Sequence, residues 1–256
     1  MSVPALQATA LSKSFGGVRA AVDVSFAVPP GTLTAIIGPN GAGKTTLFNL
    51  VTNLFPVDAG EVRCFGTPLA GRTAAEVAKL GLIRTFQSAR IFPGMTVLEN
   101  VLAGAHLLAG SSTLSQMLWL PAARREERAL IARGEALLEI AGLAAYRDAA
   151  ANELPIGAQK LLEVIRGLMA RPRLMLLDEP AAGLNDAETA ELASLLRAVR
   201  ANGITLVVVE HNMSLVMGVA DQVIVLDLGS IVASGTPAEI QANPRVVAAY
   251  VGAEAT

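Results

Sequence analysis

The chain has 256 residues, 52% of them apolar, and a formal net charge of −2. Its length allows a large core, but no apolar stretch reaches the roughly 18 residues of a membrane helix, and the N-terminus lacks the long apolar segment of a secretory signal. The charge provides no basic surface for nucleic acid. We therefore expect a soluble, cytoplasmic chain with no nucleic-acid partner. The lone cysteine, Cys64, excludes an internal disulfide and predicts a small buried side chain.

The N-terminal third predicts strands and one helix. Alternation between residues 3 and 28 predicts strands, and one face is expected to carry Val22, Val24, Phe26 and Val28. The short, β-branched run Leu33–Ile37 suits a buried parallel strand. A helix is expected over Lys44–Val51, and a turn at Asp58–Gly60 leads to another strand over Val62–Phe65.

The middle of the chain reads as helical. Thr96 and Glu99 have the spacing of a capping box, so a helix should begin there. A second helix is expected over Ala122–Ala141, ended by Gly142, with a loop at Gly110–Thr113 between the two. We interpret residues 88–170 as a helical subdomain inserted into an α/β chain.

The α/β pattern resumes after this insert. Leu174–Leu177 is an apolar strand that ends at two acidic residues, and Ile204–Val209 is a second strand. Segments Val223–Leu226 and Ile231–Ala233 predict a hairpin, and Thr236–Glu239 is another capping box. The helix between the two strands should bury one stripe, formed by Leu192, Leu195, Leu196 and Val199.

A phosphate-binding motif lies between the predicted strand and helix near residue 40. The segment fits G-x-x-x-x-G-K-[ST], whose glycines and backbone N–H groups close round a phosphate at a helix N-terminus. Lys44 is expected to reach the β- and γ-phosphates of ATP, and the Thr45 hydroxyl to hold Mg²⁺. The expected nucleotide-binding residues of the loop are Gly38, Pro39, Asn40, Gly41, Ala42, Gly43, Lys44, Thr45 and Thr46.

Other polar residues follow predicted strands. Asp178 is placed to hold the Mg²⁺, and Glu179 to act as general base toward the attacking water. His211 follows the strand that ends near Glu210, where a histidine can reach a ligand crevice. His211 and Gln87 read equally well as ordinary loop residues, and His106 is interpreted as structural or surface.

These motifs, in this order, resemble the ATP-binding cassette (ABC) ATPases over essentially the whole chain. The resemblance implies catalytic roles for Lys44, Gln87, Glu179 and His211, with Gln87 as the Q-loop residue and a further Mg²⁺ ligand beside Thr45 and Asp178. Ala182–Asn185 resembles the D-loop. Phe15 stands where the family places an aromatic that stacks on adenine, although a core phenylalanine is the competing interpretation.

The family resemblance implies one ABC ATPase domain over residues 1–256. Its fold would be α/β, with a P-loop NTPase core and mainly parallel sheet from residues 1–87 and 171–256. An N-terminal antiparallel β portion would join this core, and the helical subdomain of residues 88–170 would carry the signature region. Two ATP molecules would lie between two such cassettes.

One subgroup is most similar: the ATPases of importers for branched-chain amino acids and for related amides and urea. The resemblance rests on Arg84–Gln87, Met95–Val101, Ala181–Asn185, Glu210–Met213 and Tyr250–Gly252. It implies a second ABC ATPase subunit in a homo- or heterodimer, transmembrane permease subunits and, indirectly, a solute-binding protein. It also implies a peripheral location on the inner face of the cell membrane. The alternatives are a lipopolysaccharide or lipid exporter, whose C-terminus is also similar, and a non-transport ABC ATPase.

The signature region departs from the family pattern. Where relatives carry LSGGQ or LSYGQ, this chain has Leu154–Ala158, with Pro155 in place of the serine. Proline has neither a hydroxyl nor an N–H, whereas Gly157 could still present its N–H to ATP held by the other subunit. We interpret this as an asymmetric dimer with one slow site. The alternative is that Gly157 and the helix dipole suffice.

Overall fold

The structure is a computed structural model that describes residues 3–85, 91–105 and 121–253. It divides into two compact units. The first comprises Met1–Gln87, Arg173–Ala182 and Thr189–Thr256, and the second comprises Ser88–Pro172 and Gly183–Glu188.

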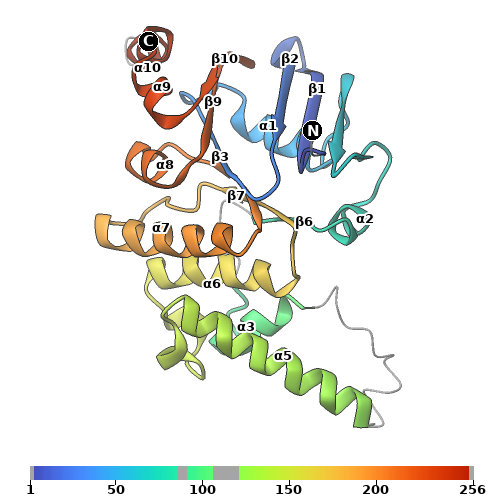
Figure 1. The fold of residues 1–256 in the computed structure, drawn as a ribbon, viewed down its shortest axis with the longest axis vertical. Coiled ribbons are helices and arrows are strands. Elements are labelled where there is room, and N and C mark those ends of the chain that lie inside the picture. Colours follow the sequence, from blue (N-terminus) through green and yellow to red (C-terminus); the bar gives the residue numbers. More distant parts are fainter. Residues whose placement is uncertain (1–2, 86–90, 106–120, 254–256) are drawn as a thin grey trace. The chain divides into compact units, whose positions relative to one another are not determined.

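A six-stranded sheet forms the centre of the first unit, in the order β10-β9-β3-β8-β7-β6. Figure 1 labels its strands β10, β9, β3, β7 and β6. Five strands run parallel and β10 is antiparallel to β9. Val209 of β8 pairs with Asp178 of β7 and with Ile36 of β3, so these three strands end at one edge. The strands are β3 (Leu33–Ile37), β6 (Leu82–Arg84), β7 (Leu174–Asp178), β8 (Thr205–Val209), β9 (Gln222–Asp227) and β10 (Ser230–Gly235).

A smaller antiparallel sheet has the order β2-β1-β4-β5. Its strands are β1 (Leu6–Phe15), β2 (Val18–Val28), β4 (Ala59–Cys64) and β5 (Thr67–Pro68). Ala10 and Asp23 have φ values of 52° and 51°, and the pairing register shifts beside them. Such a bulge interrupts the two-residue period. The prediction that Val22 lies on the same face as Val24 is therefore wrong, since Ala21 and not Val22 is buried together with Val24.

Six helices of the described chain contribute to the first unit: α1 (Lys44–Val51), α2 (Ala74–Lys79), α7 (Asp186–Ala201), α8 (Met213–Val219), α9 (Pro237–Gln241) and α10 (Pro244–Ala253). One core cluster joins α1, through Leu47 and Phe48, to both sheets. A second cluster joins the opposite side of β3 and β9 to α8, α9 and α10. The apolar stripe predicted for α7 is confirmed as buried.

The second unit is helical in its described part. It contains α3 (Val97–Ala103), α5 (Pro121–Ile140) and α6 (Ile156–Met169), with short 3₁₀ turns at Ala144–Tyr146 and Ala151–Glu153. Helix α3 packs against α5 and α6. Gly104 permits this close approach, because a Cβ there would lie 1.9 Å from the Arg166 carbonyl oxygen. The side chains of Leu161, Leu162, Ile165, Leu168 and Met169 on α6 are buried. The predicted loop at residues 110–113 lies outside the described residues.

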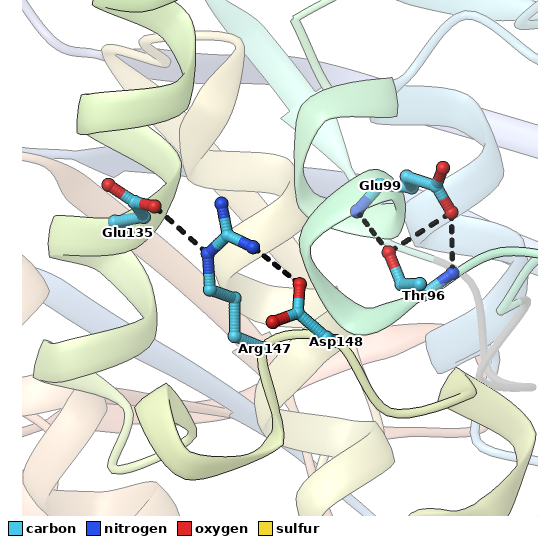
Figure 2. Close-up of polar contacts among 5 residues, drawn as sticks. All are labelled: Thr96, Glu99, Glu135, Arg147 and Asp148. Carbon is cyan, nitrogen blue, oxygen red and sulfur yellow. Dashed lines mark hydrogen bonds and ion pairs between the residues drawn. The ribbon is translucent and has the colours of Figure 1, made fainter.

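Polar contacts define the start of α3 and the connection after α5 (Figure 2). The capping box predicted at Thr96 is present: the Glu99 N–H donates to Thr96 Oγ1 at 3.2 Å, and the Thr96 N–H donates to Glu99 Oε2 at 2.7 Å. Arg147 bonds to Glu135 on α5 at 2.9 Å and to Asp148. Because these side chains are exposed, their ion pairs contribute little to stability and mainly orient the chain after α5.

No helix within residues 3–85, 91–105 and 121–253 combines the length and the apolar character needed to span a membrane.

Cys64 offers a test of the packing between the two sheets. Its side chain is fully buried in the core cluster that contains α1, and burial raises the pKa of its thiol to about 11. Because the thiolate is the reactive form, we expect a thiol reagent at pH 8 to leave the folded protein unlabelled and to label it fully in denaturing urea. Leu228→Cys at an 80% exposed position is the control that reacts at once. Rapid labelling of folded Cys64 would contradict the packing.

Candidate functional site

The loop between β3 and α1 packs closely on its surroundings. Gly38 has φ +153°, and a Cβ there would lie 2.1 Å from the Leu226 carbonyl oxygen. Gly43 has φ +96°, and a Cβ there would lie 2.5 Å from the Ala20 carbonyl oxygen. Glycine is therefore required at both positions by local backbone geometry. Pro39 is half-buried, whereas Asn40 and Gly41 are exposed.

The first turn of α1 presents unused hydrogen-bond donors. Gly43 is the N-cap and supplies no side-chain cap. Among the described residues, none accepts a hydrogen bond from the backbone N–H of Gly43, Lys44, Thr45 or Thr46. These N–H groups and the positive end of the helix form a site suited to an anion.

Lys44 folds back over the same loop. Its Nζ donates to the carbonyl oxygens of Gly38 at 2.6 Å and Pro39 at 2.9 Å. Burial lowers the pKa of Lys44, and the Glu179 carboxylate acts in the opposite direction. Thr45, the next residue, is exposed. The loop thus places an ammonium group and an accessible hydroxyl beside the free N–H groups.

Asp178 ends β7 and is buried with a charged partner. Arg84, at the end of β6, donates from Nη2 to Asp178 Oδ2 at 2.8 Å, and the two side chains are 9% and 4% exposed. The same guanidinium donates to Asn49 Oδ1 at 2.7 Å and to Thr52 Oγ1 at 3.2 Å, both on or next to α1. It also lies 5.4 Å from the centre of the Phe48 ring. Arg84 therefore links β6, β7 and α1, a role that the sequence analysis missed.

Glu179 occupies a turn beyond β7. Its φ of +47° is uncommon for a residue with a side chain. Its N–H donates to the Val209 carbonyl oxygen at 2.9 Å, and its own carbonyl accepts from the Ala182 N–H at 3.1 Å. The turn is thereby attached to the end of β8.

His211 follows β8 and is exposed, while Glu210 before it is fully buried. The register of the sheet brings Lys44, Asp178, Glu179 and His211 to the ends of three adjacent strands. No motif in the sequence predicts a catalytic or binding role for Glu210. Gln87 lies outside the described residues.

Phe15 ends β1 and is 43% exposed, so the competing interpretation as a core residue is wrong. The Phe55 ring meets it edge to face, with ring centres 5.7 Å apart. Lys13 Nζ lies 5.4 Å from the centre of the Phe15 ring and is bonded to Asp58 at 2.6 Å. The ring orientation is thus supported by a second aromatic and by a charged group.

The divergent signature segment lies in the second unit. Pro155 is the N-cap of α6 and provides no side-chain cap. Gly157, in the first turn, is buried, and a Cβ there would lie 2.6 Å from Glu188 Oε1. Glu188 in turn accepts a hydrogen bond from the Asn185 N–H at 3.0 Å. Gly157 thus lies against the Glu188 side chain.

The residues of the first unit fit a nucleotide and its metal ion. The loop offers N–H donors and Lys44 to phosphate oxygens, and the Thr45 hydroxyl and the Asp178 carboxylate are oxygen donors of the kind that Mg²⁺ prefers.

Comparison with known proteins supports the assignment of a nucleotide-binding site independently of the geometry. Residues 21–182 match the family described as ABC transporter, and residues 230–256 match the family described as branched-chain amino acid ATP-binding cassette transporter. The chain is 39% identical to the high-affinity branched-chain amino acid transport ATP-binding protein BraF of Pseudomonas aeruginosa and 38% identical to LivG of Escherichia coli. Each alignment covers 98% of this chain and 99% of the relative.

Solved structures agree with the fold. An ATP-binding cassette of an ABC transporter in its ADP conformation superposes with a TM-score of 0.84 and 32% identity, covering 98% of this chain and 99% of that one. A component of the ABC transporter complex cbiONQ from Clostridium perfringens superposes with a TM-score of 0.81 and 26% identity, covering 95% and 92% of the two chains. The predicted fold class, α/β with a P-loop core, is confirmed.

The Arg84–Asp178 pair leads to a stability prediction. Arg84→Met leaves the buried Asp178 carboxylate without its ion-pair partner, which typically costs about 3–5 kcal/mol. We expect urea unfolding without nucleotide to show a loss of that order. The double variant Arg84→Met/Asp178→Asn should recover part of it, because no buried charge is then left unpaired.

Arg63→Met is the matched control, since Arg63 pairs with Glu61 where both side chains are more than 40% exposed and should change stability little. Equal effects of the Arg84 and Arg63 substitutions would show that the buried pair has no special role.

Proposed function

This chain belongs to the ABC transporter family, and we propose that it is the ATP-binding subunit of an importer that takes up branched-chain or related amino acids. The observation that supports the ATPase site most directly is the convergence of Lys44, Asp178, Glu179 and His211 at three neighbouring strand ends. The relatives BraF and LivG, described as branched-chain amino acid transport proteins, support the substrate class. The C-terminal match at residues 230–256 favours the importer over the exporter alternative.

Each residue of the site has a role in ATP hydrolysis. Lys44 and the N–H groups of Gly43–Thr46 bind the β- and γ-phosphates, and the other loop residues, Gly38–Ala42, shape the cradle. Phe15 stacks on the adenine. Thr45, Asp178 and Gln87 would hold Mg²⁺, which would supply positive charge to neutralise the phosphate oxygens.

Glu179 acts on the water. Its carboxylate accepts a proton from the water as the oxygen attacks the γ-phosphorus, and the bond to the bridging β–γ oxygen breaks. His211 orients the γ-phosphate from the end of the neighbouring strand. Positioning and charge stabilisation supply most of the acceleration.

The partners follow from the family. A second ABC ATPase subunit closes two nucleotide sites with this one, and Gly157 faces the ATP of that subunit. The dimer acts on transmembrane permease subunits, which receive solute from a binding protein. On this proposal the whole chain, residues 1–256, is one ABC ATPase domain on the inner face of the cell membrane.

The proposed general base, Glu179, provides a direct test. Glu179→Gln removes the general base but keeps the shape of the side chain, so we expect steady-state ATP hydrolysis to fall by about 10²–10⁴-fold. A fluorescent ATP analogue should still bind, and sizing in Mg-ATP should show a dimer of the variant. Unchanged hydrolysis in Glu179→Gln would contradict the proposed site.

The substrate class can be tested by restoring uptake in cells that lack this chain. The wild-type chain should restore leucine uptake, Glu179→Gln should not, and uptake of a basic amino acid serves as the control. Restoration of uptake by the inactive variant would contradict the importer role.

A separate prediction concerns the signature segment. Pro155→Ser introduces the missing hydroxyl at the start of α6. If hydrolysis is limited by the missing contact between this hydroxyl and the ATP of the other subunit, the rate of ATP hydrolysis should rise by about tenfold. That factor corresponds to one charge-assisted hydrogen bond to phosphate. Asn152→Ser adds a hydroxyl at a nearby exposed position and should change nothing. An unchanged rate in Pro155→Ser would mean that Gly157 and the helix dipole suffice.

A further inference from the structure

Glu210 is a buried carboxylate that the proposed mechanism does not use. It follows β8 directly and is 0% exposed. A buried charge is costly unless hydrogen bonds compensate it. Its N–H donates to the Ile36 carbonyl oxygen at 3.2 Å, which places its backbone beside the end of β3. The Glu210 carboxylate therefore requires hydrogen-bond donors inside the fold.

Two separate segments donate to this carboxylate. Oε1 accepts from the Ala181 N–H at 2.7 Å. Oε2 accepts from the N–H groups of His211 at 3.0 Å and Asn212 at 3.2 Å. The first donor lies two residues after Glu179, and the other two donors are His211 itself and the residue after it. One carboxylate thus bridges the segments that carry two proposed catalytic residues.

The bridge reinforces the turn that carries Glu179. Glu179 has a left-handed backbone conformation, which such a residue adopts at an energetic cost when its surroundings enforce it. On one side the Glu179 N–H is bonded to the Val209 carbonyl oxygen at 2.9 Å. On the other side the Ala181 N–H is bonded to Glu210. The end of β8 therefore holds the turn before and after it.

A carboxylate is suited to this bridge and an amide is not. Ionised glutamate has two acceptor oxygens, so it serves both segments at once. Glutamine has one acceptor, and its NH₂ group would face the N–H of the other segment. One segment would then lose its partner and meet a donor instead.

We propose that Glu210 is a positioning residue, which fixes the turn carrying Glu179 relative to His211 so that both reach the γ-phosphate together. The inference rests on the proposed ATPase function. Glu210 itself touches neither nucleotide nor water in this mechanism. Because displacement by about 1 Å can cost roughly 100-fold in rate, a residue that sets the spacing affects turnover more than binding.

The test compares Glu210→Gln with the wild-type protein. We expect kcat to fall by about 10- to 100-fold, while the dissociation constant of a fluorescent ATP analogue changes less than twofold. Hydrogen exchange should accelerate at the amides of Ala181, or of His211 and Asn212, without a general loss of protection. Glu210→Asp retains the charge and both acceptors on a shorter side chain, so its kcat should be intermediate.

Asp221→Asn is the matched control. Asp221 accepts a backbone hydrogen bond from Leu33 at 2.8 Å and pairs with Arg200, beside the opposite end of β3. It should lower stability without changing kcat per folded molecule.

Several outcomes would overturn the proposal. These are a Glu210→Gln kcat within twofold of wild type, or a parallel loss of ATP binding and turnover, which would show a merely structural role. If Glu210→Gln does not fold, Glu210→Asp decides by the same two criteria. Wild-type turnover that Glu179→Gln does not reduce would instead refute the proposed function, and that result is obtained independently of Glu210.

Discussion

The parallel alignment of β3, β8 and β7 is the constraint on which the proposed site depends. Their register places Ile36, Val209 and Asp178 side by side, so the loops that follow them leave the sheet at one edge. Parallel strands buried on both faces need continuous apolar sequences, and all five residues of each of these strands are buried. Hydrophobic packing of the strands thus determines where the polar residues beyond them meet.

Charged side chains at this edge are accommodated in three different ways. Asp178 is paired with a guanidinium, Glu210 accepts bonds from backbone N–H groups, and Lys44 donates to backbone carbonyl oxygens. In a medium of low dielectric constant such interactions are strong, and an unpaired group is correspondingly costly. Each charge is therefore held in one position by neighbours from other parts of the chain. This arrangement suits a site in which groups must be oriented before substrate arrives.

Much of the fold could be predicted because its signals are local. Leu33–Ile37 and Lys44–Val51 have the predicted limits, since a β-branched run and a glycine before a helix are visible in a few residues. The short helices α2, α8 and α10 were missed, because their six, seven and ten residues provide little periodicity. The bulge at Asp23 was missed as well, since a left-handed aspartate leaves no distinctive pattern.

The site was predicted less completely than the fold. Lys44 and Asp178 belong to compact motifs, whereas the partners of Asp178 and Glu210 lie 94 and 29 residues away in sequence. Such contacts can be predicted only once the strand order is known. Gly157 illustrates the opposite case. Its place in the family motif suggested contact with a nucleotide, whereas its packing against the Glu188 side chain became visible only in the structure.

The bulge in β2 also bears on how this protein avoids aggregation. β2 is an edge strand of 11 residues, long enough to act as a template for a foreign strand. Asp23 interrupts it with a left-handed kink, and the adjacent Val22 N–H is already bonded to the Gly229 carbonyl oxygen at 2.8 Å. An incoming strand meets two short segments separated by a carboxylate, where continuous pairing would fail. A backbone irregularity that obscured the sequence pattern thus protects the free edge of the sheet.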